Sequence, residues 1–189
     1  MIRNLLLTAI VATAIVAGEV AYSTKEKNVY LEANSDRVVG KLLPTNAIEI
    51  LEEVGDRVKF KIEGFQNPKT GSIIYYTTKA RIFSLAFART AEPELEVLDD
   101  SLEDGWRRVS TIAYTTKGDF ESKLEPMMQR AGKLYSDNCS MCHTLHEVNH
   151  YTANQWPPTF KGMIERTPLD KDDIWLVTQY LQKNAKDMK

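Results

Sequence analysis

The sequence is poor in cysteine and histidine, the side chains that bind transition metals most readily. Its 189 residues include only two cysteines and three histidines, and its longest mainly apolar run has 14 residues. The net charge of -2 gives no reason to expect nucleic acid or an anionic membrane surface as a partner. We find no glycine-rich phosphate loop, no Ser/His/Asp or Cys/His nucleophile arrangement and no internal repeat. The chain therefore offers no candidate for a catalytic nucleophile.

The apolar run "LLLTAIVATAIVAG" lies close to the N-terminus, after a single positive charge at Arg3. It is too short to cross a bilayer as a helix, which takes about 20 residues. A short basic region, a short apolar region and small residues after it are typical of a secretory signal. We therefore predict a signal peptide at residues 1–23, or a short anchor if it is not cleaved, and a periplasmic protein that meets the membrane only if the segment is retained.

The soft ligands are concentrated in one segment, "DNCSMCHTLHEVNHYTANQW", which contains Cys139, Cys142, His143, His146 and His150. A disulfide between two cysteines three residues apart would close a very small loop and add little stability. A redox dithiol requires a thioredoxin-like context, and a zinc site of this kind requires a second Cys-x-x-Cys. "CSMCH" instead matches the Cys-x-x-Cys-His signature of c-type haem attachment.

That signature has a physical basis. Residues three apart lie on one face of a helical turn, so Cys139 and Cys142 can both reach the vinyl edges of one porphyrin. The adjacent His143 can then bind the iron as its proximal axial ligand. The single motif predicts one covalent haem c per chain.

Helical patterns flank the motif. Before it, Pro126 suits a first helical turn, and Met128, Ala131, Tyr135 and Cys139 follow the spacing of one helix face. After it, "DKDDIWLVTQYLQKNAKD" begins with a good N-cap, Asp170, and continues with an apolar stripe at Ile174, Val177 and Leu181.

A glycine within a helix costs about 1 kcal/mol relative to alanine. We therefore expect Gly132 to mark the place where the last helix packs against the first, with the aromatic residues Trp175 and Tyr180 in the contact. This arrangement, over residues 124–187, resembles a class I cytochrome c domain.

The middle of the chain has a different pattern. Residues 28–89 contain short stretches rich in Val, Ile and Phe between turn signals, and "VKFKIEGF" alternates apolar and polar residues as a strand does. The order of these stretches resembles a bacterial SH3-like barrel. "EPELEVLDDSLEDG" is most typical of a solvated acidic linker, with a docking patch for a basic partner as the weaker interpretation. A second strand-like passage, "GWRRVSTIAYTTKGDF", follows it.

The predicted fold class is therefore an α+β chain in two parts. An N-terminal SH3-like small β-barrel with its linker occupies residues 28–120. An all-α, class I-like cytochrome c domain with one haem occupies residues 121–189.

Beyond these patterns, the chain is similar to the C-terminal monohaem region of the TorC-type pentahaem cytochromes. The similarity lies in "EILEEVGDRVKFKIEGFQ", "ARIFSLAF", "GKLYSDNCSMCH", "HYTANQW" and "DIWLVTQYLQKNAKD". The resemblance implies electron transfer to a periplasmic molybdopterin enzyme, trimethylamine N-oxide reductase. It leaves dimethyl sulfoxide and biotin sulfoxide reductases open as acceptors.

One departure bears on the electron donor. The family's N-terminal half binds four haems and accepts electrons from quinol, whereas this sequence has a single Cys-x-x-Cys-His. The resemblance therefore implies a separate quinol-oxidising cytochrome or complex upstream.

The class I resemblance also suggests a sixth iron ligand, because the distal methionine of those domains precedes the terminal helix. Met163 has that placement, seven residues before Asp170, and Pro157–Pro158 would stiffen the loop that leads to it. His150 is the alternative, although it is only seven residues beyond His143. His146 is a weaker rival for the same position, and it is otherwise expected at the surface near the haem edge.

Three functions fit these features. The first is an electron-transfer protein that is not itself an enzyme. The second is a haem-based redox or gas sensor, or binding module, with an SH3-like interaction domain. The third is a haem enzyme such as a peroxidase. The sixth ligand distinguishes them, because a stable six-coordinate iron suits electron transfer and an open site suits sensing or catalysis.

Overall fold

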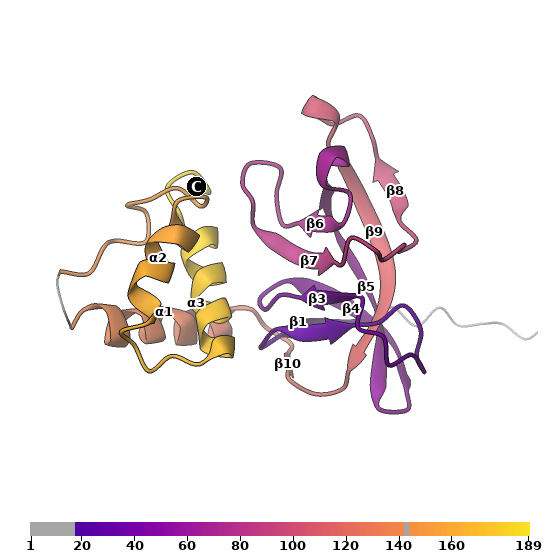
Figure 1. Ribbon diagram of the computed structural model, residues 1–189, viewed down its shortest axis with the longest axis horizontal. Helices are drawn as coiled ribbons and strands as arrows, with labels where there is room; N and C mark the ends of the chain where they lie inside the picture. Colours follow the sequence, from indigo (N-terminus) through magenta and orange to yellow (C-terminus); the bar gives the residue numbers. More distant parts are fainter. Residues whose placement is uncertain (1–17, 142–143) are drawn as a thin grey trace, which may run out of the picture.

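The structure is a computed structural model that describes residues 18–141 and 144–189, so Cys142 and His143 lie outside the described residues, as do residues 1–17 of the predicted signal peptide. Figure 1 shows the helices grouped on one side of a large antiparallel sheet. The described strands are β1 (Glu19–Ser23), β2 (Lys27–Val29), β3 (Gly40–Leu42), β4 (Ala47–Val54), β5 (Arg57–Gln66), β6 (Ile73–Tyr75), β7 (Phe83–Phe87), β8 (Glu96–Asp99), β9 (Arg107–Thr116) and β10 (Phe120–Glu121). The helices are α1 (Glu125–Cys139), α2 (Trp156–Ile164) and α3 (Lys171–Lys183), and the short 3-10 turns are η1 (Pro68–Thr70) and η2 (Glu103–Gly105).

The centre of the sheet is the pair β5 and β9, which are antiparallel over ten residues each, from Arg57 opposite Thr116 to Gln66 opposite Arg107. The main strand order is β10-β1-β4-β5-β6-β7-β3-β2, and β9 pairs with both β5 and β8. The sheet curls, so that Tyr30, directly after β2, forms a bridge to Tyr114 of β9. Curling encloses an apolar core on one face of the sheet; its members include Val29, Leu42, Ile48, Phe60, Ile62, Ile74, Leu85, Val109 and Ala113.

The predicted fold class was wrong. Within the described residues the chain is mostly β, with one curled antiparallel sheet of ten strands, and it has only three short helices. It is not a small SH3-like barrel followed by an all-α cytochrome c domain. Alternation in the sequence indicates individual strands but not which strands pair. The pairing of β5 with β9 joins segments about 50 residues apart, and it depends on burial that no local pattern reveals.

One sequence interpretation changes with this sheet, and the end of a second predicted segment belongs to it. The acidic stretch expected to be a solvated linker contains β8, which pairs with β9. Residues 19–23, assigned to the end of the predicted signal peptide, form β1, which pairs with β4 and β10. In the part of the chain that is described, no helix has both the length and the apolar character needed to cross a membrane.

Candidate functional site

The first cysteine of the haem motif lies at the C-terminal end of α1. Pro126 lies in the first turn of that helix, as predicted. The buried face consists of Met127, Ala131, Tyr135 and Cys139, each four residues after the previous one. The buried methionine is thus Met127, where the sequence pattern had indicated Met128. Cys139 is directed by this spacing to the interior and not to solvent.

Cys139 is part of an apolar cluster formed by all three helices and the loop before α2. It is 6% exposed, and its buried neighbours in the cluster include Trp156, Phe160, Val177 and Leu181. Burial raises the pKa of the Cys139 thiol, because a thiolate would lose its hydration there. A thioether carries no such ionisable proton, so covalent attachment suits this environment better than a free thiolate does.

The loop after the motif is fastened to the helices by two hydrogen bonds from buried aromatic residues. The Tyr135 hydroxyl donates to the carbonyl oxygen of His146 at 2.9 Å, and Trp156 Nε1 donates to the carbonyl oxygen of Val148 at 2.9 Å. The two rings contact each other edge to face, with centroids 5.9 Å apart. Burial is the largest cause of a raised pKa at Tyr135, so its hydroxyl stays protonated and remains a donor.

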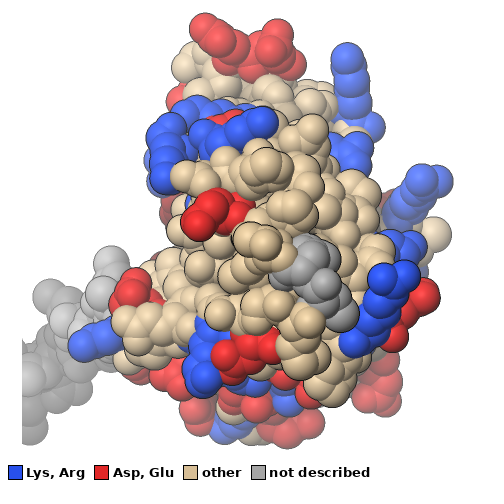
Figure 2. Space-filling view, turned by 90° about the vertical axis from the view of Figure 1, so that its left-hand side faces the viewer, with Lys and Arg blue, Asp and Glu red and all other residues tan. Residues whose placement is uncertain are grey.

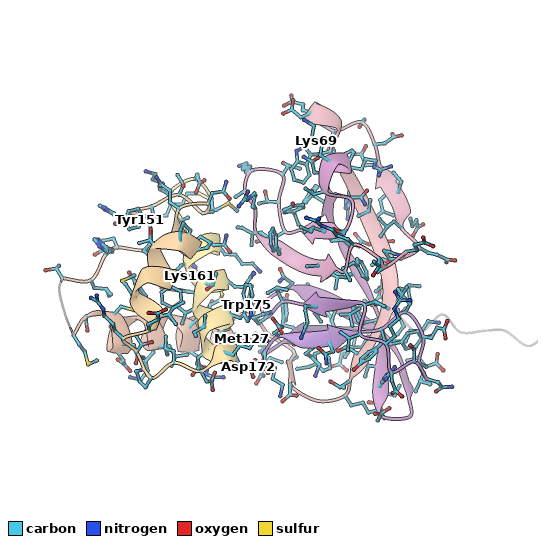
Figure 3. All side chains as sticks on the ribbon, in the orientation of Figure 1. Lys69, Met127, Tyr151, Lys161, Asp172 and Trp175 are labelled. Atoms are coloured by element: carbon cyan, nitrogen blue, oxygen red, sulfur yellow. The ribbon has the colours of Figure 1, made fainter. Side chains whose placement is uncertain are left out.

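The two histidines of this loop lie against each other. The rings of His146 and His150 stack with centroids 5.1 Å apart, and Tyr151 meets His150 edge to face at 4.6 Å. Tyr151 in turn contacts Trp156 at 5.0 Å. His150, the alternative axial ligand, is exposed, and His146 is half-buried. Figure 3 places Tyr151 at one end of the helical group.

Met163 lies near the end of α2 and is partly buried against the cluster that contains Cys139. Pro157 and Pro158, expected to stiffen a loop, instead lie in the first turn of α2, where proline needs no amide hydrogen bond. The helix, and not an extended loop, therefore carries Met163.

These residues fit a haem. A porphyrin needs apolar walls, and the cluster supplies them, with the Cys139 thiol inside it and the Met163 thioether at its boundary. Among residues 18–141 and 144–189, no group of three or more His, Cys, Asp or Glu side chains gathers in a way that could hold a metal ion.

The predicted packing of α1 on α3 is confirmed for Tyr180, but Trp175 lies on the side of α3 toward Phe83 and Pro157 and not against Gly132. A Cβ atom at Gly132 would lie 3.2 Å from the ring carbon Cζ of Tyr180, so glycine allows this aromatic side chain to lie against the α1 backbone. Asp170 caps α3 as expected, since its side chain accepts a hydrogen bond from the Asp173 amide at 2.9 Å. The Gly132–Tyr180 contact fixes α3 relative to the helix that carries Cys139, whereas the Asp170 cap stabilises the first turn of α3 itself.

A second buried face of α3 was not recognised in the sequence. Gln179 Nε2 donates to the carbonyl oxygen of Phe83 at 3.0 Å, and Gln182 Nε2 donates to the carbonyl oxygens of Ala153 and Arg81 at 3.1 and 3.3 Å. Both glutamines are buried. The sequence feature that could have revealed this face is the spacing of three residues between Gln179 and Gln182, which puts both on one side of the helix, beside the apolar stripe.

Lys183 completes this contact between α3 and the sheet. Its ammonium donates to the Thr45 carbonyl oxygen at 2.8 Å and to Thr45 Oγ1 and Asn46 Oδ1 at 3.0 Å each, and it lies 4.3 Å from the centre of the Tyr76 ring. Burial lowers the pKa of Lys183 to about 7.

Comparison with known proteins places these features in a family. The family described as TorC third cytochrome c domain matches residues 15–120, which cover the sheet and contain no cysteine. The cytochrome c-type protein TorC of Escherichia coli (strain K12) is 28% identical over 181 residues, which cover 93% of this chain and 46% of TorC. The cytochrome c-type protein TorY of Haemophilus influenzae is 31% identical over 153 residues, 78% of this chain and 41% of TorY.

The chain thus spans about half the length of the curated relatives it matches. No solved structure matches it. The family match covers more than half of the chain, and the similarity to TorC continues through the segment with "CSMCH". The chain therefore belongs to the TorC third cytochrome c domain family, whose members are c-type cytochromes.

Proposed function

We propose that the chain binds one haem c through thioether bonds to Cys139 and Cys142, with His143 as the proximal iron ligand. The observation that carries this proposal is the single "CSMCH", whose first cysteine ends α1 on a buried, apolar face. The helix positions the Cys139 sulfur, and the cluster around Trp156 and Phe160 keeps water away from it. The bound haem would supply one-electron chemistry.

Met163 is our proposed sixth ligand. It carries a soft sulfur donor and borders the apolar cluster of Cys139, whereas His150 is exposed and stacked on His146. A methionine ligand raises the reduction potential relative to histidine. That direction suits a protein that passes electrons to a high-potential oxide.

We further propose that the protein transfers electrons in the periplasm and does not itself catalyse a substrate reaction. The acceptor in this proposal is a molybdopterin reductase of the trimethylamine N-oxide type, and the donor is an upstream quinol-oxidising cytochrome or complex. Support comes from the similarity to TorC and TorY over most of the chain. The signal-like segment at residues 1–23 supports export, with a retained anchor as the alternative.

The surface on the helix side is suitable for a short-lived contact with such a partner. Figure 2 shows that much of the middle of this face is uncharged, with charged residues of both signs mainly around it. Met141, inside the haem motif, is 69% exposed. Weak electron-transfer complexes bury little area, and exposed methionine adapts to different partner surfaces.

Haem attachment is tested by replacing Cys139 and Cys142 together with alanine. We expect haem staining on a denaturing gel to disappear, because both covalent bonds are removed. A single Cys139→Ala variant should retain weaker staining through the remaining thioether. Staining of unchanged strength in the double variant would disprove the attachment site.

The sixth ligand is tested by the weak absorption band near the red end of the oxidised spectrum that marks sulfur coordination to iron. We expect the band in the unsubstituted protein and its loss in Met163→Ala, with His150→Ala as the control that keeps it. If the band is absent at the outset, or only His150→Ala changes the spectrum, then His150 is the ligand. Carbon monoxide binding to the unsubstituted reduced protein would favour the sensor function.

Electron transfer is tested with the reduced full-length protein. We expect trimethylamine N-oxide to re-oxidise it only when the reductase is present. Oxidation by the N-oxide alone would show that the protein is an enzyme. Dimethyl sulfoxide and biotin sulfoxide reductases, assayed in the same way, establish which acceptor is served.

A further inference from the structure

A pocket of about 260 Å³ opens beside η1, where the sheet meets the loop before α2. Figure 3 places Lys69, one of its lining residues, at one end of the sheet. The half-buried ring of Trp106 lines the pocket, and the buried Tyr75 supports this ring edge to face, with centroids 5.2 Å apart. The pocket therefore offers one accessible aromatic surface to a ligand.

Three cationic residues, Lys69, Lys79 and Arg81, line the same pocket, and all three are exposed. Among the described residues, none of the three forms an ion pair. Lys117 and Lys171, by contrast, pair with carboxylates at 2.6 and 2.8 Å. Long basic side chains cover the protein surface with their stems and keep their charged heads in water. Three positive charges are thus available at the mouth of the pocket.

Hydrogen bonds fix the backbone that carries these cations. The Lys69 amide donates to Asn67 Oδ1 at 2.9 Å, and the Arg81 amide donates to Asn154 Oδ1 at 2.8 Å. The second bond joins the loop between β6 and β7 to the loop before α2, so it holds two walls of the pocket together. A site that is already formed loses less conformational freedom when a ligand binds.

The charges and the walls define the ligand. In the described part of the chain, no carboxylate lines the pocket, and clustered charge of one sign attracts ions of the opposite sign. A guanidinium binds a carboxylate through two parallel hydrogen bonds. A cavity of about 150 Å³ is enough to hold benzene, so this pocket has room for one ring and its substituents. We propose that it binds a small free dianion in which one planar ring carries two carboxylates, with the carboxylates at the three cations and the ring on Trp106.

This site goes beyond the proposed electron transfer and does not rest on it. The lining residues of the pocket include neither Cys139 nor Met163 nor His150. Ligand binding can therefore be measured whether or not the haem assignment is correct, and a failure to bind leaves that assignment unaffected.

The decisive experiment compares isophthalate with isophthalamide, a neutral compound of the same shape. Binding to the purified full-length protein is measured by calorimetry. An exposed ion pair changes Kd by up to about fivefold, so we expect two pairs to make isophthalate bind roughly tenfold more tightly. Raising the salt concentration from about 0.02 M to about 0.2 M should reduce this advantage, because exposed charges are screened. Equal affinities, an advantage unchanged by salt, or no binding of isophthalate at millimolar concentration would overturn the proposal.

The contribution of the ring is tested with glutarate, which has two carboxylates and no ring. An aromatic contact corresponds to roughly a three- to tenfold difference in Kd, so glutarate should bind that much more weakly than isophthalate. Isophthalate should also shift the NMR signal of the Trp106 indole and leave that of the buried Trp156 in place. Glutarate binding as tightly as isophthalate, or an unshifted Trp106 signal, would contradict the assigned ligand.

Variants connect the preference to the pocket. Lys79→Gln combined with Arg81→Gln should make isophthalate and isophthalamide bind equally, and both changes lie at exposed positions. Lys123→Gln, at an exposed lysine outside the pocket, is the control and should keep the preference. A preference that persists in the double variant, or that is lost to the same extent in Lys123→Gln, would show that the pocket is not the binding site.

Discussion

Lys183 should make the stability of the fold depend on pH in an unusual direction. Its partners are neutral acceptors, Thr45 and Asn46, and the face of the Tyr76 ring. The three hydrogen bonds favour the charged ammonium, but burial outweighs them and lowers the pKa of Lys183 to about 7. In the unfolded chain a lysine keeps its ordinary value, 10.5.

The sign follows from the number of protons bound. Below pH 7 both the folded and the unfolded chain hold the proton, so this group adds no pH dependence. Between pH 7 and 10.5 the unfolded chain holds a proton that the folded chain has released, so the free energy of unfolding rises with pH. The slope is at most about 1.4 kcal/mol per pH unit, which gives at most about 2 kcal/mol between pH 7 and 9.

The assay is urea unfolding of the wild type and of Lys183→Met from pH 6 to 10, followed by far-ultraviolet circular dichroism. Methionine keeps the length of the side chain and removes the titrating group. Subtracting the variant cancels the other ionisable residues, and we expect the wild-type-minus-variant difference to rise above pH 7. Lys186→Met, at an exposed position three residues away, is the control. A difference that stays constant from pH 6 to 10 would refute the argument.

Two further predictions concern how α3 is held. Gly132→Leu should lower the free energy of unfolding by about 1–3 kcal/mol, because the leucine side chain would meet the Tyr180 ring. Adding Tyr180→Ala to the same chain should recover part of the loss. Equal stability of Gly132→Leu and the wild type in urea would contradict this prediction. Glu26→Gln should lower the free energy of unfolding at pH 7, and the effect should disappear toward pH 3. Burial raises the pKa of Glu26, but hydrogen bonds from Lys171 and Lys41 outweigh it and hold this pKa below its ordinary value. The stabilisation by the carboxylate is therefore lost as the pH falls and the group is protonated. A pH-independent effect, measured by the same unfolding assay, would show that this carboxylate is not stabilised by its partners.

The local features that the sequence predicted correctly have short-range causes. Pro126 starts a helix because its ring sets the backbone angle, and Asp170 caps one because its carboxylate accepts an amide proton two or three residues on. Gly132 indicated a close approach, and α3 makes that approach through Tyr180. Alternation over residues 58–65 predicted a strand, and β5 contains all of those residues.

The features that the sequence did not reveal depend on contacts between distant segments. Nothing in "EPELEVLDD" shows that Glu96–Asp99 will pair with β9. Acidic residues are generally unfavourable in strands, and only the exposed position of this strand makes them acceptable here. Pro157–Pro158 read as a loop because proline usually breaks helices, yet both fit a first turn. The pocket lined by Lys69, Lys79 and Arg81 was also invisible, since its walls come from separate segments of the chain.

Only some of the residues proposed to bind haem lie in the part of the chain that the structure describes. Cys139 ends α1 and lies in an apolar cluster, but its attachment to haem remains a prediction from the motif. Met163 borders the same cluster, although it is carried by a helix. The assignments of Cys142 and His143 remain predictions from the motif, since these residues lie outside the described ones.

The arrangement of α3 gives the sheet a specific place in the proposed function. A helix of a globular protein usually buries one apolar stripe and leaves the opposite face in water. Here Val177 and Leu181 pack toward Cys139, while Gln179, Gln182 and Lys183 are fastened to the sheet. Removing the sheet would expose three polar side chains whose partners are backbone and side-chain oxygens of other segments. The helices that carry the haem motif therefore depend on the sheet for their geometry, and a fragment of residues 120–189 should be less stable than the same helices in the full chain.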